Sequence, residues 1–408
     1  MVELVTAADV EAANELLAGI VRRTPTVHSR ALSERLGGDV WLKCENLQRA
    51  GSFKIRGAYT RMSRLGNAAR HGVVAASAGN HAQGVALAAR ELGLPARVFM
   101  PHGAPLPKLD ATRGYGAEIE LAGYSVDDAL VHAQAYAERT GAVLIHPFDH
   151  ADVVAGQGTA GLEILAARPD VRTVLVPAGG GGLIAGIATY LAERAPHVTV
   201  LGVQAEQAAA YPTSLAAGRP VPLETDGRPM PTMADGIAVA RPGDVPFALI
   251  EQHVAEVVTV SEELISRAML VLLERQKLLA EPAGAVAVAA LLDEKIADRL
   301  ETPVVAVVSG GNVDPLLLMR LVRHGMASAG RYLRVQVRVP DQPGSLAGLL
   351  ATLAETDANV LEVEHVRTGP QLAVNDVEIA VWVETRGDAH CATVVETLRT
   401  AGYEPRTE

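Results

Sequence analysis

Lysine is scarce in this sequence, and one lysine lies in an unusual setting. The chain has 31 arginines but only five lysines, namely Lys43, Lys54, Lys108, Lys277 and Lys295. Lys54 alone is flanked by small residues, in the stretch GSFKIRGA from 51 to 58. A lysine removed from water loses its proton more readily, and its neutral amine is a nucleophile able to form a Schiff base with a carbonyl compound. By itself, the setting also fits a lysine that extends from a helix start into solvent.

A run of four glycines forms a second candidate site. Gly179, Gly180, Gly181 and Gly182 lie within PAGGGGLIAG, after a run typical of a strand and before one typical of a helix. Backbone N–H groups without neighbouring Cβ atoms, placed at a helix N-terminus, form a site for a phosphate dianion. The segment lacks the Lys-Ser/Thr ending of a nucleotide P-loop and the spacing of the dinucleotide fingerprint. We therefore expect a small phosphate-bearing cofactor, although a plain flexible turn fits the same residues.

Two further loops carry polar side chains at the ends of strand-like runs. In SAGNHAQG (77–84), Ser77 is placed to cap a helix, and Asn80 and His81 face whatever lies above the loop. In SGGNVD (309–314), Ser309 ends a strand and two glycines allow close approach of the backbone. Each loop alone is ambiguous. Together, the four loops supply an amine, a phosphate site and polar contacts for one small ligand.

Composition and charge limit the class of ligand. The chain of 408 residues has 49% hydrophobic but only 3% aromatic residues, a mixture typical of layered α/β domains. Its formal charge of −11 argues against nucleic acid and against an anionic membrane as partners, because both would be repelled. Cys44 and Cys391 lie far apart without a metal-binding spacing, so we expect two free thiols and no metal site. The N-terminal segment has no secretory or transit pattern, which predicts a cytoplasmic protein.

Strand-like and helix-like periods alternate up to residue 325. The strand candidates are the short apolar runs at 72–77, 96–100, 118–122, 143–147, 174–178, 199–204 and 304–309. Helical stretches lie between them, and several end at a glycine that can cap them. Residues 174–192 carry no charge, but the four glycines favour a strand, a loop and a helix over a membrane span. The alternation predicts parallel sheets that bind ligands at the carboxyl ends of their strands.

The pattern changes beyond the small-residue stretch GMASAGR at 325–331, which suits a linker. Residues 332–339 alternate as a strand does, and residues 344–356 follow a helical period. Two alternating runs and a second helix then follow, at 359–367, 377–385 and 390–402. The sequence therefore predicts a separate module with the order β-α-β-β-α and a less distinct last strand.

The ordered motifs carry a family resemblance. GSFKIRGA, SAGNHAQG, PAGGGGLIAG, MADGIAV, EPAGAVAVAAL and SGGNVD resemble, in this order, the threonine dehydratase (threonine ammonia-lyase) branch of the fold type II pyridoxal-phosphate enzymes. Residues 332–403 resemble an ACT domain, a regulatory module that binds amino acids. The resemblance implies an α/β fold type II architecture with two parallel or mixed-sheet subdomains, followed by a βαββαβ domain. The implied domains are a catalytic domain at 1–325 with a small subdomain at about 45–150, a linker at 326–331 and an ACT-like domain at 332–408.

The resemblance also implies a role for each motif residue around pyridoxal 5'-phosphate. Lys54 forms the Schiff base with the cofactor, and its released amine takes the Cα proton of the substrate. Phe53 packs against the cofactor ring, Asn80 bonds the ring hydroxyl, and Ser309 faces the pyridine nitrogen. The cofactor phosphate is held by Gly179, Gly180, Gly181, Gly182 and the amide of Leu183. The substrate carboxylate is held by the loop that contains Ser77, Ala78, Asn80 and His81.

The implied reaction removes water and ammonia from L-threonine to give 2-oxobutanoate, and L-serine would give pyruvate. Because a neutral serine does not keep the pyridine nitrogen protonated, Ser309 favours elimination over transamination. Serine racemases of the family carry a second serine where this chain has Ala78, so we expect poor racemisation. Their divalent-cation site is matched at Glu206 but not at Pro212. Glu281 matches a residue near the cofactor, or is a plain carboxylate at a helix start.

Three alternative functions remain open from the sequence. One is a serine racemase or serine dehydratase, a second is a pyridoxal-phosphate enzyme that performs β-replacement, and a third is a non-catalytic amino-acid sensor. The lysine contexts of the β-replacement branches differ from SFKIRGA. Intact Lys54, Asn80, glycine loop and Ser309 argue against a protein that has lost catalysis.

The ACT-like segment implies allosteric regulation, which is typical of enzymes of isoleucine biosynthesis. In RVPDQPGSLAGLL, a strand turns through Pro343 and Gly344 into a helix whose first N–H groups are free to bind a carboxylate. Isoleucine or valine is the effector that the family implies. A homo-oligomer, either a dimer or a tetramer, is also implied, and the module alternatively serves only to hold subunits together.

Overall fold

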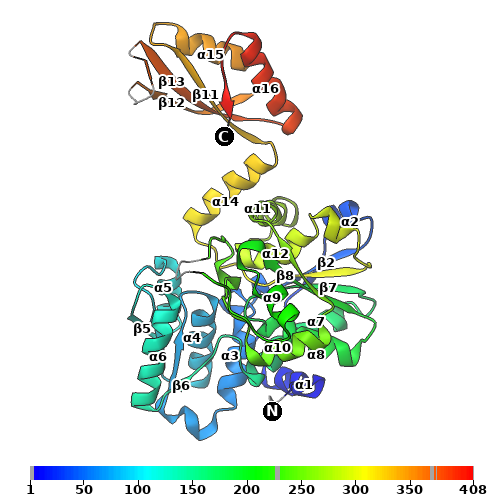
Figure 1. The fold of residues 1–408 in the computed structure, drawn as a ribbon. Helices are drawn as coiled ribbons and strands as arrows, with labels where there is room; N and C mark the ends of the chain where they lie inside the picture. Colours follow the sequence, from blue (N-terminus) through cyan, green and yellow to red (C-terminus); the bar gives the residue numbers. More distant parts are fainter. Residues whose placement is uncertain (1–3, 226–229, 368–371, 374, 408) are drawn as a thin grey trace. The chain divides into compact units, whose positions relative to one another are not determined.

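The computed structural model describes residues 4–225, 230–367, 372–373 and 375–407. The chain divides into two compact units, Met1–Leu318 and Met319–Glu408, which are described separately. Helix α14 (Pro315–Ser328) crosses this division (Figure 1). It includes residues 326–328, which the sequence assigns to a linker. Met326 and Ala327 are good helix formers, so these residues continue the helix although the small-residue stretch also suits a linker.

The larger sheet of the first unit has six strands in the order β1-β2-β10-β7-β8-β9. The strands are β1 (Thr26–His28), β2 (Val40–Cys44), β7 (Thr173–Pro177), β8 (Thr199–Ala205), β9 (Glu256–Val260) and β10 (Val304–Val308). All neighbours are parallel except β1, which runs antiparallel to β2. Parallel strands covered on both faces read as continuous apolar runs, and such runs indicate β7, β8 and β10 in the sequence. The sequence does not indicate β1, β2 or β9, which are short or contain a charged residue.

The smaller sheet is fully parallel, with the order β5-β4-β3-β6. Its strands are β3 (Val73–Ala76), β4 (Ala96–Met100), β5 (Glu118–Leu121) and β6 (Val143–Leu144). Strand β6 is shorter than the expected run at 143–147, because the ring nitrogen Nδ1 of His146 accepts hydrogen bonds from the N–H groups of Phe148 and Asp149 and turns the chain. Side chains of β3 alternate between two cores, with Val73 and Ala75 in one and Val74 and Ala76 in the other.

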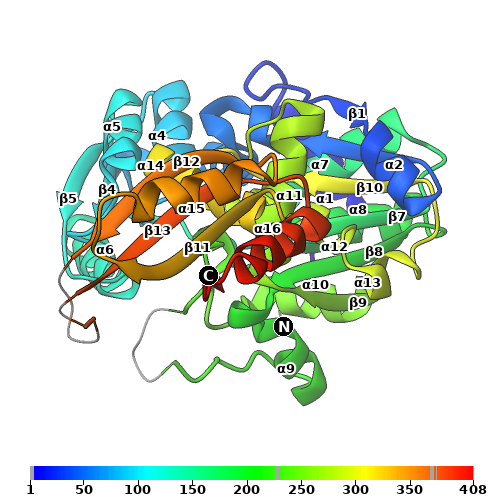
Figure 2. The same ribbon diagram turned by 90° about the horizontal axis from the view of Figure 1, so that it is seen from above.

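Helices surround both sheets of the first unit, as Figures 1 and 2 show from two directions. They are α1 (Ala7–Leu16), α2 (Arg30–Leu36), α3 (Lys54–Ser63), α4 (Asn80–Leu92), α5 (Leu106–Gly114), α6 (Val126–Thr140), α7 (Ala151–Ala167), α8 (Gly182–Arg194), α9 (Ala210–Ala217), α10 (Asp244–His253), α11 (Glu262–Val271), α12 (Pro282–Ala290) and α13 (Glu294–Ala297). Helix α6 covers one face of the small sheet, and α3 and α4 pack on the other. The predicted α/β architecture with two parallel or mixed sheets is confirmed.

The second unit contains one antiparallel sheet in the order β12-β13-β11-β14. Its elements are β11 (Tyr332–Pro340), α15 (Ser345–Ala354), β12 (Asn359–Val366), β13 (Asp376–Glu384), α16 (Asp388–Thr400) and β14 (Arg406–Thr407). Alternate residues of β11, including Val335, Val337 and Val339, pack in a core with Leu349 of α15 and Leu398 of α16. The order is βαββαβ, as predicted, and the indistinct last strand is the two-residue β14.

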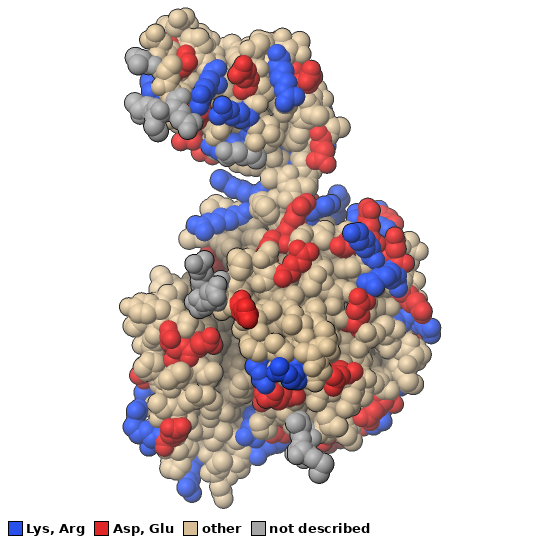
Figure 3. Space-filling model, in the orientation of Figure 1, with Lys and Arg blue, Asp and Glu red and all other residues tan. Residues whose placement is uncertain are grey.

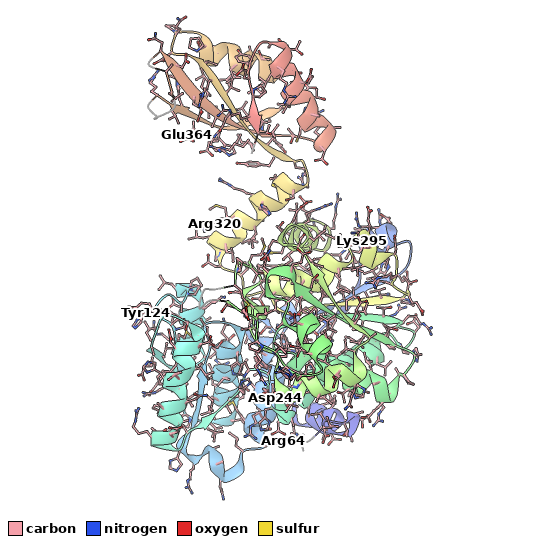
Figure 4. All side chains as sticks on the ribbon, viewed as in Figure 1. Arg64, Tyr124, Asp244, Lys295, Arg320 and Glu364 are labelled. Carbon is pink, nitrogen blue, oxygen red and sulfur yellow. The ribbon has the colours of Figure 1, made fainter. Side chains whose placement is uncertain are left out.

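Charged side chains of both signs are interspersed on the face of the molecule shown in Figure 3. Side chains such as Arg64, Asp244 and Lys295 extend outward from the first unit (Figure 4). Among the described residues, this face therefore presents no large area of one sign of charge. No helix within the described part of the chain is both long enough and apolar enough to cross a bilayer.

Helix α7 packs very closely against two neighbouring helices because glycines line both contacts. A Cβ atom on Gly156 would lie 2.6 Å from the carbonyl oxygen of Arg56 in α3. On the other side, a Cβ atom on Gly186 of α8 would lie 2.3 Å from the carbonyl oxygen of Val154. Real Cβ atoms do not approach backbone atoms so closely. The backbones of α3, α7 and α8 are therefore in direct contact, with no side chain between them at these positions.

Four charged side chains form a buried network beside this contact. The guanidinium of Arg56 donates to Glu45 at 2.8 Å and to Glu163 at 2.7 Å, and Lys43 Nζ donates to Glu163 at 2.5 Å. All four side chains are almost inaccessible to solvent. Burial alone would lower the pKa of Arg56, but the two carboxylates outweigh it and raise that pKa. The network joins β2, the start of α3 and the middle of α7, and its charges sum to zero.

We predict that Arg56→Met lowers the free energy of unfolding by ~3–5 kcal/mol, because Glu45 and Glu163 would remain buried without a cation. Urea denaturation followed by circular dichroism measures the loss. The matched control is Arg30→Met, which breaks an exposed ion pair to Glu34 whose side chains are 86% and 65% exposed. That change should cost less than ~1 kcal/mol. Equal losses in the two variants would contradict the assignment of the network as a main stabilising element.

Candidate active site

Lys54 begins helix α3 at a point where two loops meet. The N–H of Phe53 donates to the carbonyl oxygen of Ser309 at 3.2 Å, and Ser52 forms an isolated antiparallel bridge with Gly310. These contacts bring the end of β10 to the start of α3. A Cβ atom on Gly84 of α4 would lie 3.0 Å from Cβ of Lys54, so a glycine there allows α4 to pack against this lysine. The predicted residues Lys54, Phe53 and Ser309 are therefore neighbours.

The amine of Lys54 is enclosed by protein although part of the side chain remains accessible to solvent. Its Nζ donates a hydrogen bond to the carbonyl oxygen of Pro147 at 3.0 Å and lies 5.1 Å from the ring centroid of Phe53. Burial lowers the pKa of Lys54 to about 8, and the carboxylate of Glu281 opposes the shift only partly. With this pKa, roughly a tenth of the amine is neutral and nucleophilic at pH 7, far more than for a solvated lysine.

The glycine loop lies between β7 and α8, and its backbone forms the start of that helix. Gly181 has a left-handed conformation, with φ of 100°, and is the N-cap residue. The carbonyl oxygen of Gly180 accepts hydrogen bonds from the hydroxyl of Tyr211 and from the N–H of Gly243, both at 3.2 Å. These two contacts fix the loop to the protein. The first N–H groups of α8, including that of Leu183, have no acceptor within the helix and are left for an anion.

A Cβ atom on Gly179, Gly180 or Gly181 would collide with a neighbouring residue. A Cβ atom on Gly180 would lie 2.3 Å from the ring of Phe148, and one on Gly181 would lie 1.9 Å from the hydroxyl oxygen of Tyr211. A Cβ atom on Gly179 would approach Cα of Ile237 to 2.9 Å. The glycines are therefore required by close packing around the loop as well as by backbone conformation.

The loop 77–81 consists of the connection between β3 and α4, residues 77–79, and the first two residues of α4. The hydroxyl of Ser77 accepts a hydrogen bond from the N–H of Gly79 at 3.1 Å, and Ala78 offers no polar side chain. The imidazole of His81 is buried, and its Nε2–H donates to the carbonyl oxygen of Ile145 at 2.8 Å. Burial lowers the pKa of His81 to about 3, so the ring is neutral. Only the backbone of His81 is left to contact a ligand, whereas the sequence suggests an exposed side chain.

Asn80 links three loops through its side-chain amide. Its Nδ2 donates to Glu281 Oε1 at 2.5 Å, and its Oδ1 accepts from Nδ2 of Asn312 at 2.8 Å. Glu281 is buried at the N-terminus of α12. Burial, then the nearby carboxylate of Asp235, raise the pKa of Glu281 to about 7. Ser309 is also buried, and its hydroxyl lies 3.5 Å from the carbonyl oxygen of Ala283 as its only hydrogen-bond contact within the described residues.

Four residues at the site were not predicted as site residues from the sequence. They are Pro147 and Phe148, which follow β6, Tyr211, which supports the glycine loop, and Asn312, which bonds Asn80. Asn312 lies in the SGGNVD motif, so its polar side chain beside two glycines was a usable signal. Phe148 and Tyr211 have no comparable signal, because an aromatic residue in a loop is equally typical of a core.

Within the described residues, no group of three or more His, Cys, Asp or Glu side chains is arranged to hold an ion. Glu206 is exposed in the turn after β8, and Pro212 lies in α9. Pro212 supplies no carboxylate at the position where the resemblance would require one.

Comparisons with known proteins agree with this geometry. Residues 17–310 match the family described as pyridoxal-phosphate dependent enzyme, and residues 333–402 match the ACT domain. The chain is 45% identical over 404 residues to an L-threonine ammonia-lyase of Thermotoga maritima, covering 99% of both chains. It superposes on a solved threonine deaminase from T.th. with a TM-score of 0.72 and 42% identity, covering 76% of this chain and 99% of the other. A serine racemase from maize gives a TM-score of 0.74 and 34% identity, covering 78% and 97%.

The chain therefore belongs to the family of pyridoxal-phosphate dependent enzymes. It carries an ACT domain at its C-terminal end. The family resemblance and the cofactor predicted from the sequence are confirmed.

The residues of the site fit pyridoxal phosphate. The cofactor needs an amine for its aldehyde, and Lys54 supplies one whose pKa is lowered to about 8. It needs a site for a phosphate, and the glycine loop supplies the start of a 13-residue helix with no Cβ atoms over four positions. Both groups lie at loops that follow or adjoin the carboxyl ends of parallel strands, where ligands of such sheets bind.

We predict that Lys54→Ala abolishes covalent attachment of pyridoxal phosphate. Borohydride reduction followed by peptide mapping should label Lys54 in the wild-type enzyme and no lysine in the variant. Lys43 is the informative control, because its amine is also buried but is bound to Glu163. In the cofactor-free protein, the rate of attachment should rise with pH and level off above about 8, since the neutral amine reacts. A rise centred near 10, typical of a solvated lysine, or label on Lys43, would contradict the assignment.

We predict that Gly180→Ala weakens binding of pyridoxal phosphate by about 5- to 150-fold, corresponding to ~1–3 kcal/mol for overpacking. The added Cβ would lie 2.3 Å from the Phe148 ring, so the ring or the loop must move. The control is Gly103→Ala, because a Cβ atom there would meet nothing within 4 Å. Cofactor dissociation constants from fluorescence titration decide the question, and unchanged affinity in Gly180→Ala would remove the loop from the phosphate site.

Proposed function

We propose that the protein is an L-threonine ammonia-lyase, which converts L-threonine to 2-oxobutanoate and ammonia and also accepts L-serine to give pyruvate. The observation that carries the proposal is the enclosed amine of Lys54, with its pKa lowered to about 8, beside a helix start adapted to a phosphate. The similarity to an L-threonine ammonia-lyase over 99% of the chain supports the choice of substrate. When bound, pyridoxal phosphate condenses with amino groups and accepts electron density from Cα of an amino acid.

Lys54 performs the proton transfer in this proposal. Once the substrate amine has displaced it, its neutral amine is free to take the Cα proton as a general base. A pKa near 8 suits this task, because the amine is available as a base and remains basic enough to hold the proton. The carbonyl of Pro147 and the ring of Phe53 orient Nζ, since they lie 3.0 Å and 5.1 Å from it.

The loop 77–81 holds the substrate carboxylate in this proposal. The first N–H groups of α4 have no partner within the helix and face the loop, as an anion site requires. Ser77 contributes its hydroxyl or the turn that it stabilises through Gly79. Neutral His81 fixes the end of β6 to α4 through Ile145 and adds no charge that would compete for the carboxylate.

Asn80 and Ser309 adjust the electronic state of the cofactor ring in this proposal. Asn80 is oriented on one side by Glu281 and on the other by Asn312, so its amide is fixed to contact the ring hydroxyl. Ser309 has only a long contact to Ala283 at 3.5 Å, which leaves its hydroxyl free to face the pyridine nitrogen. A neutral partner keeps that nitrogen unprotonated and favours rapid loss of the β-hydroxyl over transamination.

A serine racemase is the alternative that the structural likeness raises. Racemisation requires a proton donor on the face of Cα opposite to Lys54. Ala78, which stands where the racemases carry their second serine, offers none. The loop therefore favours elimination.

The test is an assay for 2-oxo acids with L-threonine and L-serine as substrates. We expect 2-oxobutanoate from L-threonine and pyruvate from L-serine, each with one equivalent of ammonia, and no product with Lys54→Ala. Chiral chromatography of the residual serine measures D-serine in the same reaction. D-serine without 2-oxo acid would support the racemase, and binding of either amino acid without turnover would support a sensor.

We also propose that the ACT domain binds an amino-acid effector. Within this unit, a cavity of about 230 Å³ is lined by the turn 340–346, His365 and Arg367. Gly344, with φ of 98°, is the N-cap of α15, and Arg367 lies 3.4 Å from Asp341 in an ion pair. Free N–H groups and an arginine suit a carboxylate, and the aspartate suits an ammonium group. Isoleucine and valine are the first candidates, with threonine and serine as alternatives.

We predict that isoleucine or valine changes the KM for L-threonine by about 5- to 150-fold, the range of a typical coupling between sites. Deletion of residues 332–408 should remove the response and leave turnover, because the described cores of the first unit contain none of those residues. Calorimetry with isoleucine, valine, threonine and serine gives the binding heats. No heat with any of them, together with unchanged kinetics after deletion, would leave the domain with a role in assembly only.

The domain limits at 325 and 331, the cytoplasmic location and the homo-oligomeric state complete the proposal. The match of the ACT family to residues 333–402 supports a regulatory domain that begins near 332. Size-exclusion chromatography with light scattering measures the number of subunits.

A further inference from the structure

An ion pair connects the two subdomains of the first unit on the side where the active-site loops lie. Nζ of Lys108 lies 2.8 Å from Oδ2 of Asp235. Lys108 belongs to α5, which packs beside α4 and β5 of the small sheet. Asp235 begins the short turn Asp235–Ile237, which packs on α12 beside the large sheet. The pair therefore joins residues that are 127 positions apart in sequence and lie on elements beside different sheets.

The turn Asp235–Ile237 contacts two parts of the active site. A Cβ atom on Gly236 would lie 3.0 Å from Cβ of Ala283 and 3.9 Å from Oε1 of Glu281. Cα of Ile237 is the nearest atom to a Cβ built on Gly179 of the glycine loop, at 2.9 Å. The turn thus lies between the phosphate loop and Glu281, and Lys108 holds its first residue.

The same two subdomains are connected a second time at Glu281. Its carboxylate accepts the hydrogen bond from Asn80, which begins α4 of the small subdomain. The charged groups that act on Glu281 are Asp235, Lys108 and Lys54. Burial and then Asp235 raise the pKa of Glu281, whereas Lys108 and Lys54 lower it together with the hydrogen bond from Asn80. The two members of the ion pair therefore act on this carboxyl in opposite directions.

We infer that Lys108 and Asp235 are positioning residues of the active site, whose ion pair holds α5 to the turn 235–237 beside the phosphate loop and keeps Asn80 in contact with Glu281. The inference rests on the proposed function for its substrate. The Lys108 side chain is 14% exposed and that of Asp235 57%, so the pair is partly screened by water. Its effect on catalysis comes through α5, which packs beside α4, and through the turn 235–237, which lies beside Glu281.

The kinetic experiment compares the wild-type holoenzyme with Lys108→Met, Asp235→Asn and the double variant. Each single variant should raise the KM for L-threonine by up to ~5-fold, and the double variant should raise it no further, because the same pair is broken in all three. Additive increases in the double variant would overturn the inference.

The pH dependence separates a positioning role from a merely structural one. Asp235→Asn removes a negative charge near Glu281, so the apparent pKa on the acid side of the kcat profile should fall. Lys108→Met removes a positive charge, so the same pKa should rise. A structural role alone moves both profiles in the same direction or neither. Shifts of one sign in both variants would therefore contradict the inference.

A matched control exists at the opposite ends of the strands. Arg168 and Asp170 lie between α7 and β7 and form an ion pair whose side chains are 19% and 57% exposed, close to the values for Lys108 and Asp235. Asp170→Asn should change neither KM nor the pH profile. An effect as large as that of Asp235→Asn would show that the loss of any such pair is sufficient.

One measurement needs no substrate. The absorbance of the resting holoenzyme is titrated with pH for each variant, and the midpoints should move in the same opposite directions as the kinetic pKa values. If L-threonine proves not to be the substrate, the kinetic arm fails in the wild-type enzyme too, but the absorbance titration still tests the ion pair. Unmoved midpoints in both variants would overturn the inference independently of the reaction.

Discussion

The position of the reactive amine depends on the buried network around Arg56. Lys54 and Arg56 belong to the same first turn of α3, and Arg56 is bound to Glu45 after β2 and to Glu163 in α7. A charged group in such a place is costly unless every partner is present, so the network tolerates only one arrangement of these three segments. That arrangement fixes where α3 begins and therefore where Nζ of Lys54 lies. The side of α3 that faces away from Arg56 carries Ile55 and Ala58, which pack in the core of the small subdomain.

The pKa values of the ionisable groups at the site also depend on which charges lie near them. The zero net charge of the network leaves Lys54 without a strong ionic partner, and burial then lowers its pKa to about 8. Glu281, whose carboxylate acts on Lys54, has its own pKa raised to about 7 by burial and by Asp235. Both groups therefore titrate close to neutral pH. Such perturbed pairs are typical of catalytic sites, where proton transfer near neutral pH is required.

The sequence was most informative where function is carried by short contiguous motifs. Lys54, the glycine loop, the loop 77–81 and Ser309 all lie at strand ends or helix starts, and glycine and polar residues in such places carry a strong local signal. The partners of these residues could not be found in the same way. Asn80 and Glu281 are 201 positions apart, and Lys54 and Pro147 are 93 positions apart, so their contacts depend on the tertiary fold.

Strand β2 shows that prediction from the sequence has the same limit for the fold. Its sequence, VWLKC, contains a lysine that reads as a surface residue, yet Lys43 is fully buried because Glu163 from α7 lies beside it. His81 shows the same limit at the site. The sequence predicts an exposed polar side chain there, but His81 is buried and its ring donates a hydrogen bond to the carbonyl oxygen of Ile145. In both residues, a distant partner decides whether a polar side chain is exposed or buried.

The close contacts of α7 have a consequence for the size of the ligand. On one side, this helix touches the backbone of α3, which begins with the reactive lysine, and on the other side it touches the backbone of α8, which begins with the phosphate loop. Gly156 and Gly186 remove side chains from both contacts, so the separation of the two helix starts is set by the width of one helical backbone. Rotamer changes cannot alter such a separation. The span between the start of α3 and the start of α8, which a ligand bound to both must cover, is therefore set by backbone packing.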